Sequence, residues 1–308
     1  MKWNGVMPAI TTCFTPSGEL DREFIGEHSR WLIENGCTGV VALGSLGEGG
    51  ALTLAEKLAV LETCVRALKG RAPVVASISA ITTDEAISLA KSAEQIGCDA
   101  LMILPPYVYA GDWREMKAHV VAVLRATSLP AMLYNNPVAY RTDFIPEQIA
   151  ELAGEQKNLH AVKESSTDAR RVSAIRALLG DRLRVFVGVD DAILEGIGVG
   201  AVGWIAGLAN AFPRESVDLF NHGIEDEVEK AFEIYRWFLP LLRLDTVPKF
   251  VQLIKLVQGE MGIGNARVRA PKLEISGDEL ASTRKLIERA LKHRPKRSST
   301  KLKTARGR

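Results

Sequence analysis

The 308-residue sequence lacks any apolar run of the roughly 18 residues needed to span a membrane. Its first residues, MKWNGVMPAITTCF, contain one lysine and lack the apolar segment and small-residue cleavage site of a signal peptide. Hydrophobic residues make up 47% and charged residues 25%, which is typical of a globular protein and excludes a disordered or fibrous one. We therefore expect a cytoplasmic protein with no membrane partner.

Cysteine and histidine are scarce, and neither has the spacing of a metal site. The four cysteines, Cys13, Cys37, Cys64 and Cys98, form no CxxC pair, which argues against a zinc site or a disulfide framework. Four buried thiols in a reducing compartment are the better interpretation. The five histidines are scattered, with no HExxH-like pair. We expect no bound metal.

A dinucleotide-binding motif is also missing. The stretch after the first predicted strand reads TTCFTPSGEL, without the GxGxxG that would cradle a pyrophosphate. The later GVGAVG precedes a strand instead of opening a helix. The sequence therefore gives no support to a nucleotide cofactor.

The net charge of +2 is unevenly distributed. From His293 the chain reads HRPKRSSTKLKTARGR, with seven of the 39 Lys and Arg residues and no acid, so 32 basic residues face 37 acidic ones in the remainder. A polar basic segment without aromatic residues predicts a disordered tail over 293–308. Such a tail can attract nucleic acid, but a solvated extension is the simpler interpretation, and we expect no nucleic-acid partner.

Short apolar segments alternate with amphipathic ones along the first 220 residues. Strands are expected at 5–11, 39–44, 73–79, 100–106, 130–135, 159–165, 183–188 and 201–207. Amphipathic segments such as 21–36 and 53–70 separate them and predict helices. Nearly continuous Val, Ile, Leu and Ala strands are typical of a parallel sheet buried on both faces. Eight such units favour a (β/α)₈ TIM barrel over an open doubly wound sheet.

Three further helical patterns follow the barrel, at 227–245, 247–262 and 277–293. They predict a C-terminal helical appendix packed against the barrel. We divide the chain into a catalytic barrel (1–223), a helical region (224–292) and the basic tail (293–308).

Lys163 stands out because it ends an apolar strand in LHAVKESSTD, residues 159–168. TIM barrels place their active sites at the C-terminal ends of the strands. Strand alternation puts Ala161, Lys163 and Ser165 on one face, and we expect that face to point into the barrel. Burial lowers the pKa of an amine, and a neutral amine can form a Schiff base with a carbonyl. The alternative is a lysine that extends from the strand end into water.

Two neighbouring segments strengthen the first interpretation. Tyr134 ends the preceding strand, within reach of Lys163, and its phenol can carry protons during Schiff-base chemistry. Ser45 could continue a proton relay from Tyr134. Ser45 also lies in the loop GSLGE, where glycines allow backbone N–H groups to face an anion such as a substrate carboxylate. The same loop could instead be a tight turn in which Glu48 contacts nearby backbone donors.

The segments GSLGE, YNNP, VKES, GVD and GAVGWIAGLAN occur in an order and spacing that resemble the dihydrodipicolinate synthase/N-acetylneuraminate lyase family. The resemblance covers about residues 3–290. It implies a class I Schiff-base lyase that has a TIM barrel, forms a homotetramer built as a dimer of dimers, and needs no metal or organic cofactor. It also implies that Lys163 is the Schiff-base lysine and Tyr134 the general acid/base. The N–H groups of Ser45 and Leu46 would hold the carboxylate of a 2-oxo acid, and the Ile205 carbonyl would line the site.

Two positions differ from the synthase pattern. Val108 stands where the synthase has a relay tyrosine, and Ala139 where it has an arginine for the second substrate's carboxylate, with Arg141 two residues away. We therefore expect a catabolic enzyme, such as a deaminase of 1-pyrroline-4-hydroxy-2-carboxylate or an aldolase of 2-keto-3-deoxy acids. The alternatives are a 4-hydroxy-tetrahydrodipicolinate synthase of lysine biosynthesis and a catalytically silent regulatory or scaffold barrel. The presence of both Lys163 and Tyr134 argues against a silent barrel.

Overall fold

The computed structural model describes residues 1–295. Its centre is a parallel sheet of eight strands: β1 (Gly5–Pro8), β2 (Val40–Ala42), β3 (Val74–Ile78), β4 (Ala100–Ile103), β5 (Ala131–Asn135), β6 (Leu159–Glu164), β7 (Arg184–Val187) and β8 (Gly203–Ala206). Hydrogen bonds connect them in the order β1-β8-β7-β6-β5-β4-β3-β2, and a parallel bridge between Ala9 and Val41 joins β1 to β2. The sheet thus closes into the predicted barrel, with every predicted strand confirmed.

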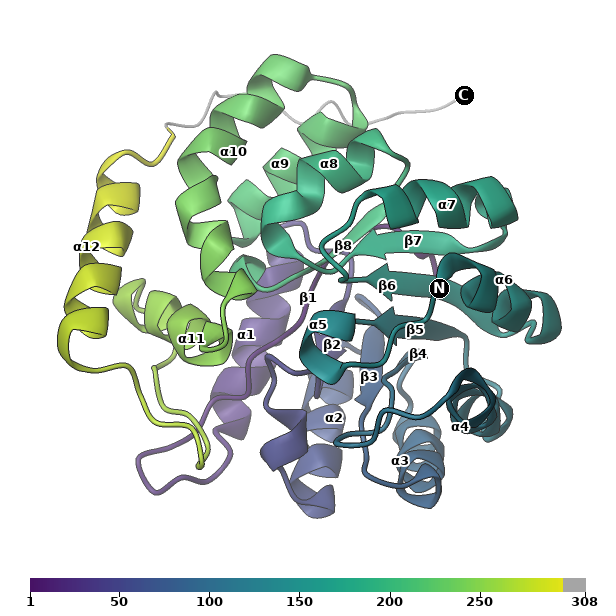
Figure 1. The fold of residues 1–308 in the computed structure, drawn as a ribbon. Helices are drawn as coiled ribbons and strands as arrows, with labels where there is room; N and C mark the ends of the chain where they lie inside the picture. The colour runs from purple at the N-terminus through teal and green to yellow at the C-terminus, as the bar shows by residue number, and fades with distance from the viewer. Residues whose placement is uncertain (296–308) are drawn as a thin grey trace.

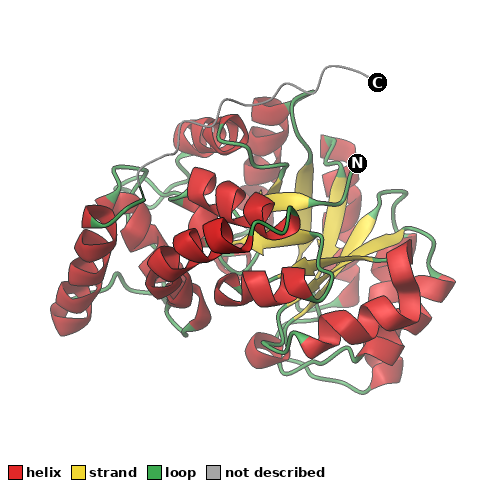
Figure 2. Cartoon of the chain, turned by 90° about the horizontal axis from the view of Figure 1, so that it is seen from above, coloured by secondary structure: helices red, strands yellow, loops and turns green. Residues whose placement is uncertain are grey.

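Helices surround this barrel on its outer face (Figures 1 and 2). One follows each strand: α1 (Arg22–Glu34), α2 (Leu54–Leu68), α3 (Thr83–Ile96), α4 (Trp113–Arg125), α6 (Pro146–Glu155), α7 (Arg170–Leu179), α8 (Ile193–Gly198) and α9 (Pro213–Ile224). A short additional helix, α5 (Pro137–Tyr140), lies between β5 and α6. The chain therefore has the predicted (β/α)₈ architecture, with one inserted turn next to Tyr134.

Local sequence explains where the barrel helices begin. Thr53 and Glu56 form a capping box at the start of α2, and Asp112 and Glu115 form one at the start of α4. Each box satisfies two backbone N–H groups that a helix start otherwise leaves unpaired. The strands consist mainly of apolar residues buried on both faces, as helices outside and side chains inside the barrel require. The four cysteines are buried free thiols, as predicted.

The helices α10 (Val228–Leu242), α11 (Phe250–Glu260) and α12 (Gly277–Lys292) form the predicted helical appendix. α10 packs against α9, and α12 packs against α10 and α11, on the side of the barrel away from α4 (Figure 1). The Trp237 indole N–H donates to the Ala290 carbonyl at 2.8 Å and ties α10 to α12. The predicted basic tail, 293–308, lies outside the described residues from 296 onward. In its described part, the Arg294 Nε donates to the Glu215 carboxylate at 2.6 Å. No helix within residues 1–295 is long and apolar enough to cross a membrane.

Candidate active site

A cavity of about 410 Å³ opens at the C-terminal ends of the strands. All five residues predicted for the site line it: Ser45, Leu46, Tyr134, Lys163 and Ile205. They come from four separate strand ends, spread over 160 residues of sequence. The fold alone brings them together, because parallel strands of a barrel all end on the same face.

Lys163 points into the barrel, as strand alternation predicts. The residue is only 7% exposed, so it does not extend into water. The next residue, Glu164, faces the opposite way and accepts hydrogen bonds from the Asn135 side chain at 3.0 Å and the Ser166 backbone at 2.7 Å. The two faces of β6 therefore have different tasks: one anchors the strand, and the other presents an amine to the cavity.

Gly188 makes room for that amine. A Cβ atom at Gly188 would lie 2.5 Å from the Cε of Lys163 and 2.0 Å from the Oγ of Ser165. Real Cβ atoms do not approach side-chain atoms so closely, and the Cγ of Lys163, near the backbone, would lie only 2.7 Å away as well. The glycine of the GVD segment is thus explained by the lysine on the adjacent strand.

Tyr134 lies at the same level of the barrel as Lys163. The two residues are paired in the register of β5 and β6, and the Lys163 Nζ lies 4.2 Å from the centroid of the Tyr134 ring. The Tyr134 hydroxyl accepts a hydrogen bond from the Asn136 side chain at 2.9 Å. A phenol so close to the amine is positioned to exchange protons with groups bound to Lys163.

The Ser45 hydroxyl is hydrogen-bonded to the hydroxyl of Tyr140, a residue of α5 that sequence reasoning missed. The ring of Tyr140 lies 5.7 Å from those of both Tyr134 and Tyr107, centroid to centroid. Burial raises the pKa of Tyr140 well above its ordinary value, and the neighbouring phenols Tyr134 and Tyr107 add to the shift. Tyr140 therefore stays protonated at neutral pH. Ser45 meets the aromatic cluster through Tyr140.

The GSLGE loop presents two free donors to the cavity. Among residues 1–295, the backbone N–H groups of Ser45 and Leu46 have no hydrogen-bond acceptor. Both residues line the cavity. Adjacent, unpaired N–H groups at a strand end can bind a carboxylate. The predicted anion-binding property of this loop therefore has a structural basis.

The alternative prediction is a turn in which Glu48 contacts nearby backbone donors, but its donors come from the C-terminal region of the chain instead. The Glu48 carboxylate is fully buried and accepts hydrogen bonds from the Lys255 Nζ at 2.9 Å and from the Arg269 backbone N–H at 2.9 Å. Lys255 belongs to α11 and also donates to the Thr12 carbonyl at 2.8 Å. Removing one partner of a buried ion pair leaves an uncompensated charge, at a cost of about 3–5 kcal/mol. The appendix thus holds the loop that presents Ser45 and Leu46.

The two positions that differ from the synthase pattern are separated in space. Ala139 lines the cavity and brings no charge. Arg141 is exposed, with a left-handed backbone (φ 58°), and is not part of the cavity wall. Val108 is fully exposed at φ 72° and does not reach the cavity of its own chain. Lys163 is the one basic side chain that lines the described cavity.

Two features of the site could not be recognised from sequence: Tyr140, which contacts the lining residue Ser45, and Asp245. Tyr140 follows Tyr134 by six residues, and only the turn of α5 brings it back over the strand end. Asp245, from the appendix, lines the cavity. Its single signal would have been an acidic residue at the end of the predicted helical pattern 227–245, which is common in any soluble protein.

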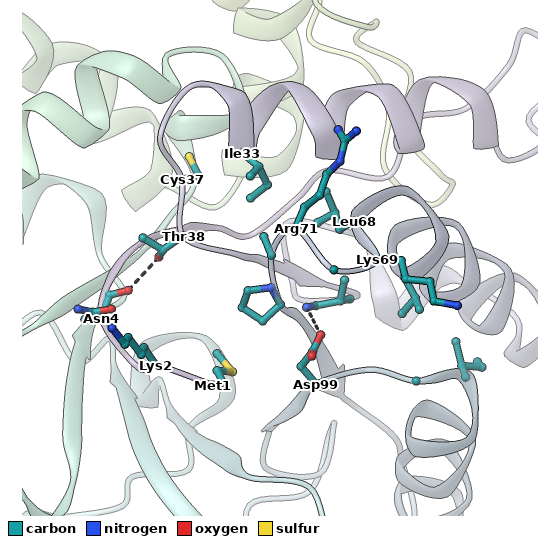
Figure 3. Close-up of a pocket in the computed structure, with 17 residues that line it drawn as sticks. Met1, Lys2, Asn4, Ile33, Cys37, Thr38, Leu68, Lys69, Arg71 and Asp99 are labelled. Atoms are coloured by element: carbon teal, nitrogen blue, oxygen red, sulfur yellow. Dashed lines mark hydrogen bonds between the residues drawn. The ribbon is translucent and has the colours of Figure 1, made fainter. Parts of the chain in front are cut away.

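A second hollow, of about 780 Å³, lies at the opposite end of the barrel (Figure 3). Asn4, Thr38 and Asp99, which precede strands, line it together with Lys69 and Arg71. The dashed contacts in Figure 3 pair Thr38 with the Asn4 carbonyl and Asp99 with the Val74 N–H. The Thr38 hydroxyl and the Asp99 carboxylate are therefore already hydrogen-bonded within the protein. This face of a TIM barrel supports stability rather than catalysis.

Comparisons with known proteins point to one family. The model of the dihydrodipicolinate synthetase family matches residues 2–290. A 4-hydroxy-tetrahydrodipicolinate synthase from Methanocaldococcus jannaschii is 32% identical over 290 residues, covering 94% of this chain and 98% of that protein. The crystal structure of a synthase from Acinetobacter baumannii, complexed with pyruvate, superposes with a TM-score of 0.89 at 26% identity, over 94% of this chain and 99% of that one. The synthase from Methylacidiphilum fumariolicum superposes with a TM-score of 0.91, also at 26% identity, over 94% and 97% of the two chains. The chain therefore belongs to the dihydrodipicolinate synthetase family, a family of class I Schiff-base lyases.

Proposed function

We propose that the protein is a Schiff-base-forming lyase for a small 2-oxo acid with a single carboxylate, or for its cyclic imine. The observation that carries this proposal is the charge of the cavity. Its described lining contains one basic side chain, Lys163, and the carboxyl of Asp245. A substrate with one carboxylate can place that group on the loop N–H donors, beside Lys163. A second carboxylate would find no cation.

The geometry supports a sequence of steps. The Ser45 and Leu46 N–H groups hold the substrate carboxylate, which places the 2-oxo carbon before the Lys163 amine. The amine adds to this carbon, and the resulting carbinolamine loses water to give the Schiff base. Tyr134 supplies the proton that leaves with the water. The positively charged imine then attracts electrons from C3. The deprotonated Tyr134 takes either the proton of a C4 hydroxyl as the C3–C4 bond breaks, or a C3 proton, after which the resulting enamine expels a leaving group from C4.

Tyr140 and Ser45 extend this proton path in our proposal. The hydrogen bond between their hydroxyls, with the Tyr140 ring against that of Tyr134, offers a route from the reacting centre to the loop. Tyr140 belongs to the same chain, so the relay does not depend on a residue at position 108. This would compensate for the valine that stands there.

Substrate ranking is the test of this function. We expect 2-keto-3-deoxygluconate or 1-pyrroline-4-hydroxy-2-carboxylate to be turned over with a specificity constant at least about 100-fold above that for pyruvate plus aspartate semialdehyde. An unpaired, desolvated carboxylate costs several kcal/mol, and about 1.4 kcal/mol already corresponds to tenfold. Specificity constants measured for the three reactions, with coupled or mass-spectrometric detection, check this expectation. The opposite ranking would contradict it.

That opposite ranking would favour the second candidate, a 4-hydroxy-tetrahydrodipicolinate synthase. The curated relatives of about 30% identity that carry this name favour it. It would require a cation for the second carboxylate, from Arg141 or from a neighbouring subunit. An Arg141→Ala substitution separates these sources, because only the first predicts a loss of condensation.

We also propose that the protein works in the cytoplasm as a homotetramer built from dimers. In support, Ile81, Val108 and Tyr109 are exposed apolar residues on the neighbouring loops after β3 and β4. The Tyr107 N–H donates to the Ala80 carbonyl at 3.1 Å and ties these loops together. Light scattering after gel filtration should give about four times the chain mass of 33.6 kDa. A monomeric mass would contradict the proposal.

A further inference from the structure

Asp245 is the one acidic residue that lines the described cavity, and it comes from the helical appendix. It belongs to a short 3₁₀ turn, Arg243–Thr246, between α10 and α11, and it lines the same cavity as Lys163. No step described above uses it. Structural carboxylates are usually paired with a cation, yet within residues 1–295 Asp245 forms no ion pair, and no basic side chain except Lys163 lines this cavity.

The position of the carboxyl is fixed by its surroundings. Gly207, at the end of β8, approaches so closely that a Cβ there would lie 2.6 Å from the Asp245 Oδ1. The Asp190 backbone N–H faces the carboxyl and acts to lower its pKa. The Asp190 side chain cannot serve as a further donor, because it accepts hydrogen bonds from the Trp204 indole at 3.0 Å and the Leu208 N–H at 2.7 Å. Asp245 is therefore held against the barrel end without a side-chain partner of its own.

The surroundings also determine its charge. Burial raises the pKa of Asp245 well above its ordinary value, and the negative charge of Asp190 raises it further, against the opposing effect of Lys163. A carboxyl accepts hydrogen bonds in either state and also donates one whenever it carries a proton. A substrate hydroxyl group has the same two capacities. A second carboxylate would instead meet lone pairs and would be repelled whenever Asp245 is ionised.

A second, independent observation points to a bound polar group in this part of the cavity. Ser165 is 2% exposed and lines the cavity, and its hydroxyl has no hydrogen-bond partner. It lies next to the Lys163 side chain, because a Cβ atom at Gly188 would contact both side chains. A buried hydroxyl without a partner costs about 1–3 kcal/mol. A ligand hydroxyl would remove that cost.

We infer that Asp245 and Ser165 form a subsite for a hydroxyl group that the substrate carries beyond C3. The inference rests on the proposed function and makes it more specific: the substrate is a hydroxylated 2-oxo acid, and Asp245 is the residue that distinguishes it from pyruvate. Pyruvate ends at C3 and therefore does not reach this subsite.

The experiment compares trapping of two probes on Lys163, which requires binding but not turnover. Pyruvate or 2-keto-3-deoxygluconate is titrated into the wild-type protein, Asp245→Ala and Asp245→Asn. Each sample is reduced with borohydride, and the fraction of protein that carries the adduct is measured by mass spectrometry. Asp245→Ala should raise the half-saturating concentration of 2-keto-3-deoxygluconate about tenfold, as expected for the loss of one well-placed hydrogen bond. The half-saturating concentration of pyruvate should change less than twofold. Asp245→Asn should restore most of the difference, because an amide also donates and accepts.

Asp278→Ala is the matched control, since it removes an exposed acid of the same appendix. An equal shift for both probes would overturn the inference, because Asp245 would then act on Lys163 rather than on the distal hydroxyl. So would unchanged values for 2-keto-3-deoxygluconate, or wild-type protein that traps pyruvate alone. Wild-type protein that traps neither probe would overturn the proposed function itself. Melting temperatures of the variants show whether each is folded.

Discussion

Lys163→Ala is expected to give no covalent adduct with pyruvate and borohydride and no measurable turnover of any 2-oxo acid. The amine is the only buried nucleophilic nitrogen that faces the cavity within the described residues, and water cannot replace it in a Schiff base. Lys163→Arg should behave in the same way, because a guanidinium remains protonated and cannot add to a carbonyl. The adduct mass, located by peptide mapping, is the measurement.

Lys157→Ala is a suitable control, since that lysine is exposed on the loop before β6. It should keep both adduct and turnover. Unchanged turnover in Lys163→Ala would refute the Schiff-base mechanism. A wild-type adduct on another lysine would show that Lys163 has only a structural role.

The second large effect is expected at Tyr134. Tyr134→Phe should lower turnover by about 10²–10⁴-fold, the usual contribution of a general acid/base. The ring next to the Lys163 Nζ is retained, so trapping of pyruvate at equilibrium should persist. Measuring the rate constant and the trapped fraction on the same preparation separates loss of proton transfer from loss of the fold.

Tyr140→Phe tests how far the proton path extends. It should reduce turnover by about tenfold, less than Tyr134→Phe, because water can replace a distant member of a relay. Tyr109→Phe is the control: its exposed hydroxyl donates to Glu115 at 2.9 Å, away from the cavity. If Tyr140→Phe retains full activity, the proton reaches solvent by a path that avoids Ser45.

For the Tyr134→Phe variant, a loss of turnover below about tenfold would contradict the role of Tyr134 as the acid/base.

The barrel and the position of Lys163 were predictable from sequence because both depend on local patterns. Continuous apolar segments predict strands buried on two faces, and strand alternation then sets the direction of the Lys163 side chain. Since parallel strands share one catalytic edge, strand ends sufficed to find Ser45 and Tyr134, whereas Ile205 followed from the family resemblance. The pairing of Tyr134 with Lys163 needed only the sequence order of neighbouring strands.

Tyr140 and Asp245 were beyond the reach of such patterns. Tyr140 contacts Ser45 only because Pro137–Tyr140 forms one helical turn, which reverses the chain after β5. The sequence also suggested Ser45 as the neighbour of Tyr134, whereas its hydroxyl meets Tyr140. Asp245 enters the cavity by the packing of the appendix on the barrel, and no periodicity of one segment determines how two segments pack.

The ion pair between Glu48 and Lys255 has a consequence for the newly made chain. During synthesis the barrel strands leave the ribosome before α11 does, and domains tend to fold from the N-terminal side. Until residue 255 emerges, the GSLGE loop would have to bury the Glu48 carboxylate without its cation. The GSLGE loop, which would bind the substrate carboxylate, should therefore be the last part of the barrel to fold. A nascent chain would then form its binding site only when synthesis is nearly complete.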